Sequence, residues 1–311
     1  MNKNYLLLLL TIPVSIFGGN TIDSLVIPAG GFGTRMLPFT WAFPKEIMPL
    51  MNKPAVQETV EEGLRSGITK FYMITKRQKS GIEDHFDVSP ELQGLLEKAG
   101  KAGLVSELKD IRDKAQFIYV RQPVQGGTGH AVAMVKNIIN DDYFCVGWPD
   151  IVVLGEPDIY KTMIELSQKY TASVIMVQPV PMAEVKHYGV VVTGRQLEPG
   201  VYEVVDLVEK PDPAVSPSNL INGGRFVLSK KIFASLDVIP VAANGELQLP
   251  DGILDMIRKG ERVICYTVKG TVHDIGRPMP WLETNILYAL QHPEFKDDTK
   301  KMLREIMKTL D

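Results

Sequence analysis

The residues with the clearest chemical potential lie at the end of the first apolar run, in the segment LVIPAGGFGTRMLPFTWAFPKEIMPL (residues 25–50). A strand-like run leads directly into a glycine-rich loop, and glycines permit positive φ angles and close approach of backbone N–H groups to phosphates. Arginine adds a bidentate donor for phosphate oxygens, and lysine adds a mobile point charge. The candidate phosphate-binding residues are Gly30, Gly31, Gly33, Thr34, Arg35 and Lys45.

This loop matches neither of two common phosphate-binding motifs. A dinucleotide-binding fingerprint requires glycine at position 36, where this chain has Met36, and a Walker A loop requires Gly-Lys and then Ser or Thr, where it has Thr34-Arg35. A glycine cluster after a strand is more often a simple tight turn. The basic residues Arg35 and Lys45 at this spacing favour a phosphate site instead.

Two aspartates are placed to contribute carboxylates. Asp150 follows the apolar run 143–148, and Asp274 lies between the run 263–268 and a helical segment. Ligands of open α/β sheets bind at the carboxyl ends of the strands, where Asp150 is expected. Taken separately, either aspartate would more often belong to a turn or a helix cap.

The elements that must position these residues follow from the hydrophobic pattern. Short β-rich runs alternate with segments of helical spacing, such as Val56-Val60-Leu64 and Val132-Val135-Ile139, which is typical of βαβ units around a parallel sheet. The predicted strands in this part are residues 25–28, 71–75, 117–120, 143–148 and 173–177.

From Gly189 onward the pattern changes to strands without intervening helices. An antiparallel hairpin is predicted from two strand-like runs, residues 189–193 and 201–208. Gly194 and Pro199-Gly200 separate the two runs. Residues 226–228 predict a further strand that leads into a helix. We therefore expect an α/β fold with a Rossmann-like, mostly parallel sheet flanked by helices and a smaller β-rich part.

The pattern also predicts the domain organisation. Residues 23–291 read as one domain, and residues 292–311 as a C-terminal helical segment that begins near His292-Pro293. Residues 1–22 are an apolar N-terminal extension or signal-like segment, because Lys3 precedes the run LLLLLTIPVSIF (6–17). That run is too short to span a bilayer, so no stable membrane span is expected, and its poor cleavage site argues against a signal peptide. An overlong gene start is the other explanation.

Composition excludes several classes of protein. The chain has 311 residues, a net charge of −3 and a pI near 6.0, which argues against a broad basic face and a nucleic-acid partner. A hydrophobic content of 45% argues against disorder. Cys145 and Cys265 form no C-x-x-C pair and the five histidines show no H-E-x-x-H spacing, which excludes a disulfide-stapled fold, a cysteine zinc site and a zincin.

Taken together, these motifs resemble a known family. G-x-G-T-R followed by P-K-E-x-x-P-L is similar to the signature of sugar-1-phosphate nucleotidylyltransferases, and within them of the bacterial uridylyltransferases. The resemblance extends over residues 25–290. The supporting blocks, in order, are HFD-S-EL-LLEK (85–98), RQ…GTGHA (121–131), PD (149–150), VEKP (208–211), GELQLPD (245–251) and HDIG (273–276). Any one block is weak, whereas six in the right order are strong.

The resemblance implies a Mg²⁺-dependent transfer of a uridylyl group from UTP to glucose 1-phosphate, giving UDP-glucose and pyrophosphate. The attacking sugar phosphate is already an anion, so the task is to bring two polyanions together and neutralise their charge. By resemblance, the catalytic cations are Arg35, Lys45 and Lys210, and the Mg²⁺ ligands are Asp150 and Asp274. Two carboxylates together with phosphate oxygens suit this hard cation.

The resemblance also implies the binding residues. Gln122, with an amide that both donates and accepts, would contact the pyrimidine together with the backbone of Gly127. The implied nucleotide-binding residues are Gly30, Gly31, Gly33, Thr34, Gln122 and Gly127, and the implied sugar-binding residues are Gly189, Glu209, Lys210 and Gly224. Hairpin geometry is an equally good explanation of Gly224. We expect His130 to be structural and Trp148 to pack rather than bind sugar.

Some positions depart from the family pattern. Trp41, Gly126 and Pro278 stand at or near positions where lysine is common, and Pro250 replaces a threonine before Asp251. These departures keep two alternatives open: a thymidylyltransferase acting on a sugar 1-phosphate, and a non-catalytic regulatory paralogue. Because UTP is kept in the cytoplasm, we expect a cytoplasmic protein, and the family suggests a homodimer or homotetramer.

Overall fold

A computed structural model describes residues 22–77 and 79–309 of the chain, so the apolar run 6–17 lies outside the described residues. Within them, one main sheet is formed by β1 (Ser24–Pro28), β4 (Lys70–Thr75), β5 (Gln116–Arg121), β6 (Tyr143–Gly147), β8 (Ser173–Pro179), β9 (Gly189–Glu198), β10 (Val201–Glu209), β11 (Leu220–Ser229) and β12 (Val263–Thr267). Two small sheets pair β2 (Pro49–Leu50) with β3 (Lys53–Pro54), and β7 (Ile151–Leu154) with β13 (Thr271–Asp274).

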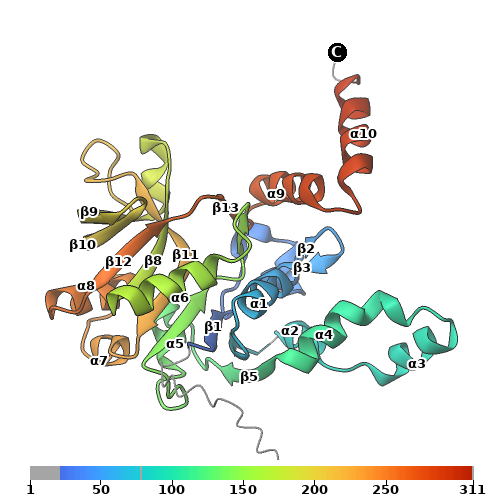
Figure 1. Cartoon of the computed structure of the whole chain (residues 1–311), viewed down its shortest axis with the longest axis horizontal. Coiled ribbons are helices and arrows are strands. Elements are labelled where there is room, and N and C mark those ends of the chain that lie inside the picture. The colour runs from blue at the N-terminus through green and yellow to red at the C-terminus, as the bar shows by residue number, and fades with distance from the viewer. Residues whose placement is uncertain (1–21, 78, 310–311) are drawn as a thin grey trace, which may run out of the picture.

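The strands of the main sheet lie in the order β5-β4-β1-β6-β11-β8-β12-β10-β9. β5, β4, β1 and β6 are parallel to one another, as βαβ units require. β11 runs antiparallel to β6 and β8, and a further antiparallel pairing of Ile221 with Val190 of β9 connects it to the predicted β9–β10 hairpin. The α/β fold is confirmed, and its β-rich part continues the same sheet rather than forming a separate layer (Figure 1).

Helices cover both faces of the sheet. They are α1 (Ala55–Arg65), α2 (Ser80–Phe86), α3 (Pro90–Lys98), α4 (Ser106–Lys114), α5 (Gly127–Ala133), α6 (Ile159–Tyr170), α7 (Ile232–Leu236), α8 (Leu249–Arg258), α9 (Pro278–Gln291) and α10 (Lys296–Met307). Residues of α1 and α6 belong to one apolar cluster against the sheet, and residues of α5, α7 and α8 belong to another. The result is a three-layer α/β/α arrangement.

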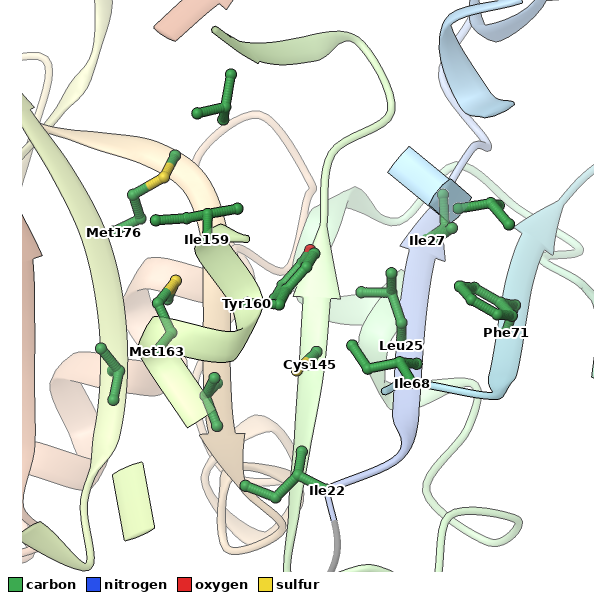
Figure 2. Close-up of a cluster of buried hydrophobic side chains, with 14 of the residues drawn as sticks. Ile22, Leu25, Ile27, Ile68, Phe71, Cys145, Ile159, Tyr160, Met163 and Met176 are labelled. Carbon is green, nitrogen blue, oxygen red and sulfur yellow. The ribbon is translucent and has the colours of Figure 1, made fainter. Parts of the chain in front are cut away.

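The alternation of side chains along β1 explains this layering. Leu25 and Ile27 point into the cluster that contains α6 residues such as Met163, whereas Val26 points into the cluster on the opposite face (Figure 2). Such a strand is apolar on both faces, which is why it reads as a continuous hydrophobic run. Ile22, which the sequence pattern placed in the N-terminal extension, is buried in the first of these clusters.

Three predicted elements differ from the structure. Gly194 lies inside β9 rather than in the turn. Glycine is needed at this position because a Cβ would lie 2.8 Å from Val205 Cγ1 of the paired strand β10. The predicted helix over Val132 to Ile139 ends at Ala133 and continues as turns. Asp274 lies between β12 and α9 as predicted, but it ends an additional strand, β13, that the sequence pattern did not indicate.

The C-terminal helices break as predicted, with α9 ending at Gln291 and α10 beginning at Lys296. Trp281 Nε1 of α9 donates to the Pro49 carbonyl (3.0 Å), which attaches this helix to β2. α10 projects away from the rest of the fold (Figure 1). Among the described residues, no helix is both long enough and apolar enough to cross a membrane.

A buried ion pair connects the sheet to the segment that carries Asp150. Arg225 of β11, whose side chain is only 1% exposed, donates to both carboxylate oxygens of Glu62 on α1, at 2.8 and 3.1 Å. The same guanidinium donates to the carbonyls of Trp148 and Ile151, each at 2.9 Å. These carbonyls flank Pro149 and Asp150, so Arg225 fixes the backbone on both sides of that carboxylate.

Replacing this arginine tests how much the fold depends on the pair. Arg225→Met leaves Glu62 as a buried, uncompensated charge, and such losses lower the free energy of unfolding by about 3–5 kcal/mol. Urea denaturation measures the change. The matched control is Arg195→Met, which breaks the exposed Arg195–Glu203 pair (2.9 Å) and is expected to leave the free energy of unfolding almost unchanged. Equal losses in the two variants would contradict the structural role of Arg225.

Candidate active site

Two cavities open near the carboxyl ends of the parallel strands. The first, of about 280 Å³, is bordered by the glycine-rich loop after β1, by Lys45, Gln122 and Trp148, and by Asp150. The second, of about 20 Å³, is bordered by Gly189, Glu209 and residues of β11 and α8. The rings of Trp148, at the first cavity, and Phe226, at the second, pack against each other with centroids 5.2 Å apart.

The glycine-rich loop needs glycine for steric reasons. Gly33 has φ +65°, and a Cβ there would lie 2.9 Å from Thr40 Cγ2 and 3.1 Å from Lys45 Cβ. A Cβ on Gly31 would lie 3.7 Å from Lys45 Cε. The loop therefore packs directly against the short turn Lys45–Ile47, which brings the predicted lysine beside the predicted phosphate-binding backbone.

Lys45 and Asp150 form an ion pair at the floor of the first cavity. Burial alone would lower the pKa of Lys45, but the Asp150 carboxylate outweighs it and holds that pKa above its usual value. Burial alone would raise the pKa of Asp150, but Lys45 outweighs it and holds that pKa below its usual value. Both groups are therefore charged at neutral pH, as an electrostatic site for phosphates requires.

Backbone pairing places the two predicted metal ligands together. β7 and β13 pair antiparallel with Asp274 opposite Ile151, and the backbone N–H of Ile275 donates to the Asp150 carbonyl (3.0 Å). A Cβ on Gly276 would lie 2.9 Å from Asp274 Oδ1, 2.9 Å from Arg35 Nη2 and 3.3 Å from Asp150 Oδ2. Glycine at position 276 thus leaves room for the two carboxylates and the Arg35 guanidinium to approach one another.

The Asp274 carboxylate lies close to two arginine side chains. Arg35 Nη1 lies 3.4 Å from Asp274 Oδ2, and Arg277 Nε lies 3.9 Å from the same oxygen. Arg277 therefore supplies a positive charge next to Pro278, where the family commonly has lysine. Arg35, Lys45 and both aspartates occupy one connected cluster, although they come from three distant parts of the sequence.

Two carboxylates beside an open space fit Mg²⁺ held partly by substrate. Mg²⁺ is usually bound through one or two carboxylates together with phosphate oxygens and water. Within residues 22–77 and 79–309, no group of three or more His, Cys, Asp or Glu side chains is placed to hold a metal ion. Asp150 and Asp274 therefore fit a shared, substrate-completed site rather than an all-protein cage.

Gln122 is oriented by a histidine. Its Nε2 lies 2.8 Å from His130 Nδ1 and 3.4 Å from the Gly127 carbonyl, so the amide donor is engaged by the protein. Its Oε1 faces Gly30, where a Cβ would lie only 2.5 Å away. His130 has the structural role expected of it, and Gln122 presents a free acceptor at the edge of the first cavity.

The sugar-binding predictions have mixed outcomes. Glu209 and Gly189 both line the second cavity, and a Cβ on Gly189 would lie 3.0 Å from Glu209 Oε2. Lys210 has φ +45°, pairs with Glu209 (2.9 Å) and is 59% exposed, so it borders neither of the two cavities. Gly224 packs against Trp148 and Ile151 instead of lining a cavity.

Thr34, predicted to bind nucleotide, is exposed and lines neither cavity.

Several residues that line these cavities were not predicted from the sequence. The additional polar lining residues are Gln125, Thr128 and Glu246 in the first cavity, and Asn222 and Asp251 in the second. Three of these five, Thr128, Glu246 and Asp251, are the polar members of the GTGHA and GELQLPD blocks. Their place in these blocks is the sequence signal that indicates them. Trp148 both packs and lines the first cavity.

Comparison with known proteins decides the family. The sequence profile described as nucleotidyl transferase matches residues 24–289. The chain belongs to the nucleotidyl transferase family. The resemblance predicted from the six blocks is confirmed, and the chain is a nucleotidyltransferase.

Two similar relatives of this nucleotidyl transferase are named UTP–glucose-1-phosphate uridylyltransferase. The protein from Staphylococcus epidermidis is 38% identical over 285 residues, which cover 92% of this chain and 98% of the relative. The protein from Bacillus subtilis is 38% identical over 280 residues, which cover 89% of this chain and 94% of the relative.

Solved structures agree with the fold of this nucleotidyl transferase. A UTP-bound UGPase from Acinetobacter baumannii superimposes with a TM-score of 0.85 at 34% identity, covering 92% of this chain and 99% of that one. A UDP-glucose pyrophosphorylase complexed with UDP-glucose gives a TM-score of 0.80 at 34% identity, covering 88% of this chain and 100% of that one.

Gly30 offers a test of the orientation of Gln122. In Gly30→Ala the new Cβ would displace Gln122 Oε1, so we expect the KM for the nucleoside triphosphate to rise by about tenfold, the loss of one hydrogen bond. Steady-state kinetics measures this change. Gly94→Ala on α3, where a Cβ meets no atom within 4 Å, is the control for the substitution itself. An unchanged KM in Gly30→Ala would remove Gln122 from the nucleotide site.

Proposed function

We propose that this chain transfers a uridylyl group from UTP to glucose 1-phosphate, in a Mg²⁺-dependent reaction that releases pyrophosphate and UDP-glucose. The observation that carries the proposal is the cluster of Arg35, Lys45, Asp150 and Asp274 next to the glycine-rich loop at the carboxyl edge of the sheet. The two named relatives, each aligned over most of its length, support the choice of substrates.

The chemistry asks for charge neutralisation rather than proton transfer. The sugar phosphate attacks as an anion, so the obstacle is repulsion between two polyanions. Lys45, at the floor of the first cavity, offsets negative charge at the α-phosphate, and Arg35 binds the β- and γ-phosphates from its exposed position. Mg²⁺, when bound, would supply further positive charge to phosphate oxygens of both substrates. Asp150 and Asp274 would hold it.

The geometry of Gln122 supports recognition of a uracil-type base. His130 and the Gly127 carbonyl engage the amide nitrogen, which leaves Oε1 to accept a hydrogen bond from an imide N–H. Uracil and thymine carry that N–H and cytosine does not. Because both uracil and thymine satisfy Gln122, the same contact also supports the alternative of a thymidylyltransferase.

The sugar would lie against the residues of the second cavity, which at about 20 Å³ is itself too small to enclose it. Glu209 and Asn222 provide acceptors and a donor for hydroxyl groups, and Phe226 provides an apolar wall. Lys210 follows Glu209 directly and would bind the sugar phosphate after its side chain leaves the Glu209 carboxylate. Gly224 would act through Trp148, whose ring it contacts, and not through direct contact with sugar.

We extend the proposal to the setting of the enzyme. Residues 23–291 would form the catalytic domain and residues 292–311 a C-terminal helical segment, with Mg²⁺ as the cofactor. The chain would act in the cytoplasm, where UTP is available, as a homodimer or homotetramer. UTP and glucose 1-phosphate would be its partners.

A substrate panel tests the activity. Pyrophosphate release is measured with UTP and dTTP against several sugar 1-phosphates, with Mg²⁺ and with EDTA. We expect UTP with glucose 1-phosphate and Mg²⁺ to give the highest kcat/KM, and chelation to abolish turnover. A higher kcat/KM with dTTP would make the chain a thymidylyltransferase. Absence of turnover with every pair, despite measurable UTP binding, would favour the regulatory paralogue.

Asp150 provides a test of the cluster itself. Asp150→Ala removes a predicted Mg²⁺ ligand and leaves Lys45 without its partner, so turnover should fall by at least about a hundredfold. Asp110→Ala, at an exposed position on α4, serves as the matched control and should keep full activity. Normal kinetics in Asp150→Ala would exclude this carboxylate from the reaction.

A further inference from the structure

A third cavity lies on the other side of the glycine-rich loop, at the carboxyl ends of β4 and β5. It has a volume of about 440 Å³ and shares Gly30 and Gln122 with the first cavity. Its lining does not include Arg35, Lys45, Asp150 or Asp274, so the catalytic cluster does not explain it.

Three basic side chains meet at this third cavity. Lys76 and Arg77 directly follow β4, and Arg121 ends β5, where it is paired with Thr75 in the parallel ladder. Its lining residues include no aspartate or glutamate. Arg77 and Arg121 form no ion pair with a carboxylate in the described part of the chain. In a chain with a net charge of −3, three cations at one cavity form a local concentration of positive charge.

Lys76 shows most directly that a partner is required. Its Nζ is buried and has no hydrogen-bond partner among residues 22–77 and 79–309, and it lies 3.0 Å from the centroid of the Phe32 ring. The Glu46 carboxylate, which would attract it, is occupied by Lys79 in a buried ion pair. Burial and the Lys79 ammonium lower the pKa of Lys76 to about 8, so it is mostly charged at neutral pH. A buried ammonium without an oxygen partner is unfavourable, and an anion would relieve it.

The third cavity also has an apolar part. Phe32 and Val124 line it and are 59% and 63% exposed, respectively. A free phosphate ion would use the three cations but would leave this apolar surface uncovered. A small organic molecule that carries a phosphate would contact both parts.

We propose that the third cavity binds a phosphate monoester of a small metabolite, outside the catalytic centre. Lys76, Arg77 and Arg121 bind the phosphate group, and Phe32 and Val124 contact the organic part. Phe32 is part of the glycine-rich loop and covers the Lys76 ammonium, so it must move when the phosphate binds. Arginine suits the bidentate contacts with phosphate oxygens, and lysine adds a point charge.

The test is a calorimetric titration of glucose 6-phosphate into the full-length chain saturated with UDP-glucose. In the proposed function, UDP-glucose occupies the nucleotide and sugar sites. Any heat of binding of glucose 6-phosphate to the saturated chain therefore comes from another site. We expect one molecule bound per chain. In the double variant Lys76→Met/Arg121→Gln the affinity should fall by at least about tenfold, because two charge-assisted contacts with the phosphate group are lost.

Controls separate the third cavity from the catalytic cluster. Arg35→Gln should leave the affinity for glucose 6-phosphate unchanged, and the double variant should keep its circular dichroism spectrum and its affinity for UDP-glucose. Three results would overturn the proposal: equal affinity for glucose 6-phosphate in the double variant and the native chain, loss of that affinity in Arg35→Gln, or no binding of glucose 6-phosphate to the native chain. Displacement of the probe by UDP-glucose would also overturn it and would assign the third cavity to the nucleotide.

A second titration distinguishes the two sources of phosphate. Inorganic phosphate is titrated under the same conditions and should bind at least about tenfold more weakly than glucose 6-phosphate, because it cannot contact Phe32 and Val124. Equal or tighter binding of inorganic phosphate would overturn the assignment to a monoester. Failure of UDP-glucose to bind at all would count against the proposed function, and the titration without it would still test the third cavity.

Discussion

The guanidinium of Arg225 donates to both oxygens of Glu62 and to the carbonyls of Trp148 and Ile151, and it does so with almost no exposure to water. These bonds join a helix, the central strand β11 and the segment that carries Asp150. The position of Asp150 then determines the rest of the catalytic cluster, since its carboxylate pairs with Lys45 and its carbonyl accepts from Ile275 next to Asp274. A buried charge pair of this kind contributes little net stability, but it permits few alternative arrangements once its partners are in place.

The catalytic cluster balances charges that would otherwise be unfavourable. Lys45 and Asp150 are both partly buried, and each holds the pKa of the other in the charged range. Arg35 and Arg277 approach Asp274 from the more exposed side. The cluster is therefore organised before phosphates arrive, and preorganised charges of this kind lower the free energy of a polyanionic transition state.

The glycine-rich loop lies between two sets of cations. On one side it packs against Lys45, which belongs to the catalytic cluster, and on the other side Phe32 covers Lys76 at the third cavity. The loop therefore connects the nucleotide site to the proposed monoester site. Any ligand that moves Phe32 would act on the backbone that we propose contacts nucleotide phosphates, and the coupling between two such ligands would be reciprocal.

Much of the fold and the site can be predicted from this sequence, for local reasons. The apolar strands, the hairpin at Pro199-Gly200 and the break before α10 follow from periodicity and from glycine and proline, which act within a few residues. The glycine-rich loop with Arg35 and Lys45 indicates phosphate chemistry for the same reason, because the residue types themselves suit that ligand.

Tertiary structure alone decided the contacts between distant residues. Arg225 and Glu62 are 163 residues apart, and β13, which sets Asp274 beside Asp150, has Val272 as its single apolar residue and so shows no apolar run. Strand order also decides that Lys210 and Gly224 do not line the first two cavities. It likewise brings together the three basic residues of the third cavity, Lys76, Arg77 and Arg121. Periodicity describes which face of an element is apolar, whereas strand order and register decide which side chains meet, and those are fixed only when the whole sheet is assembled.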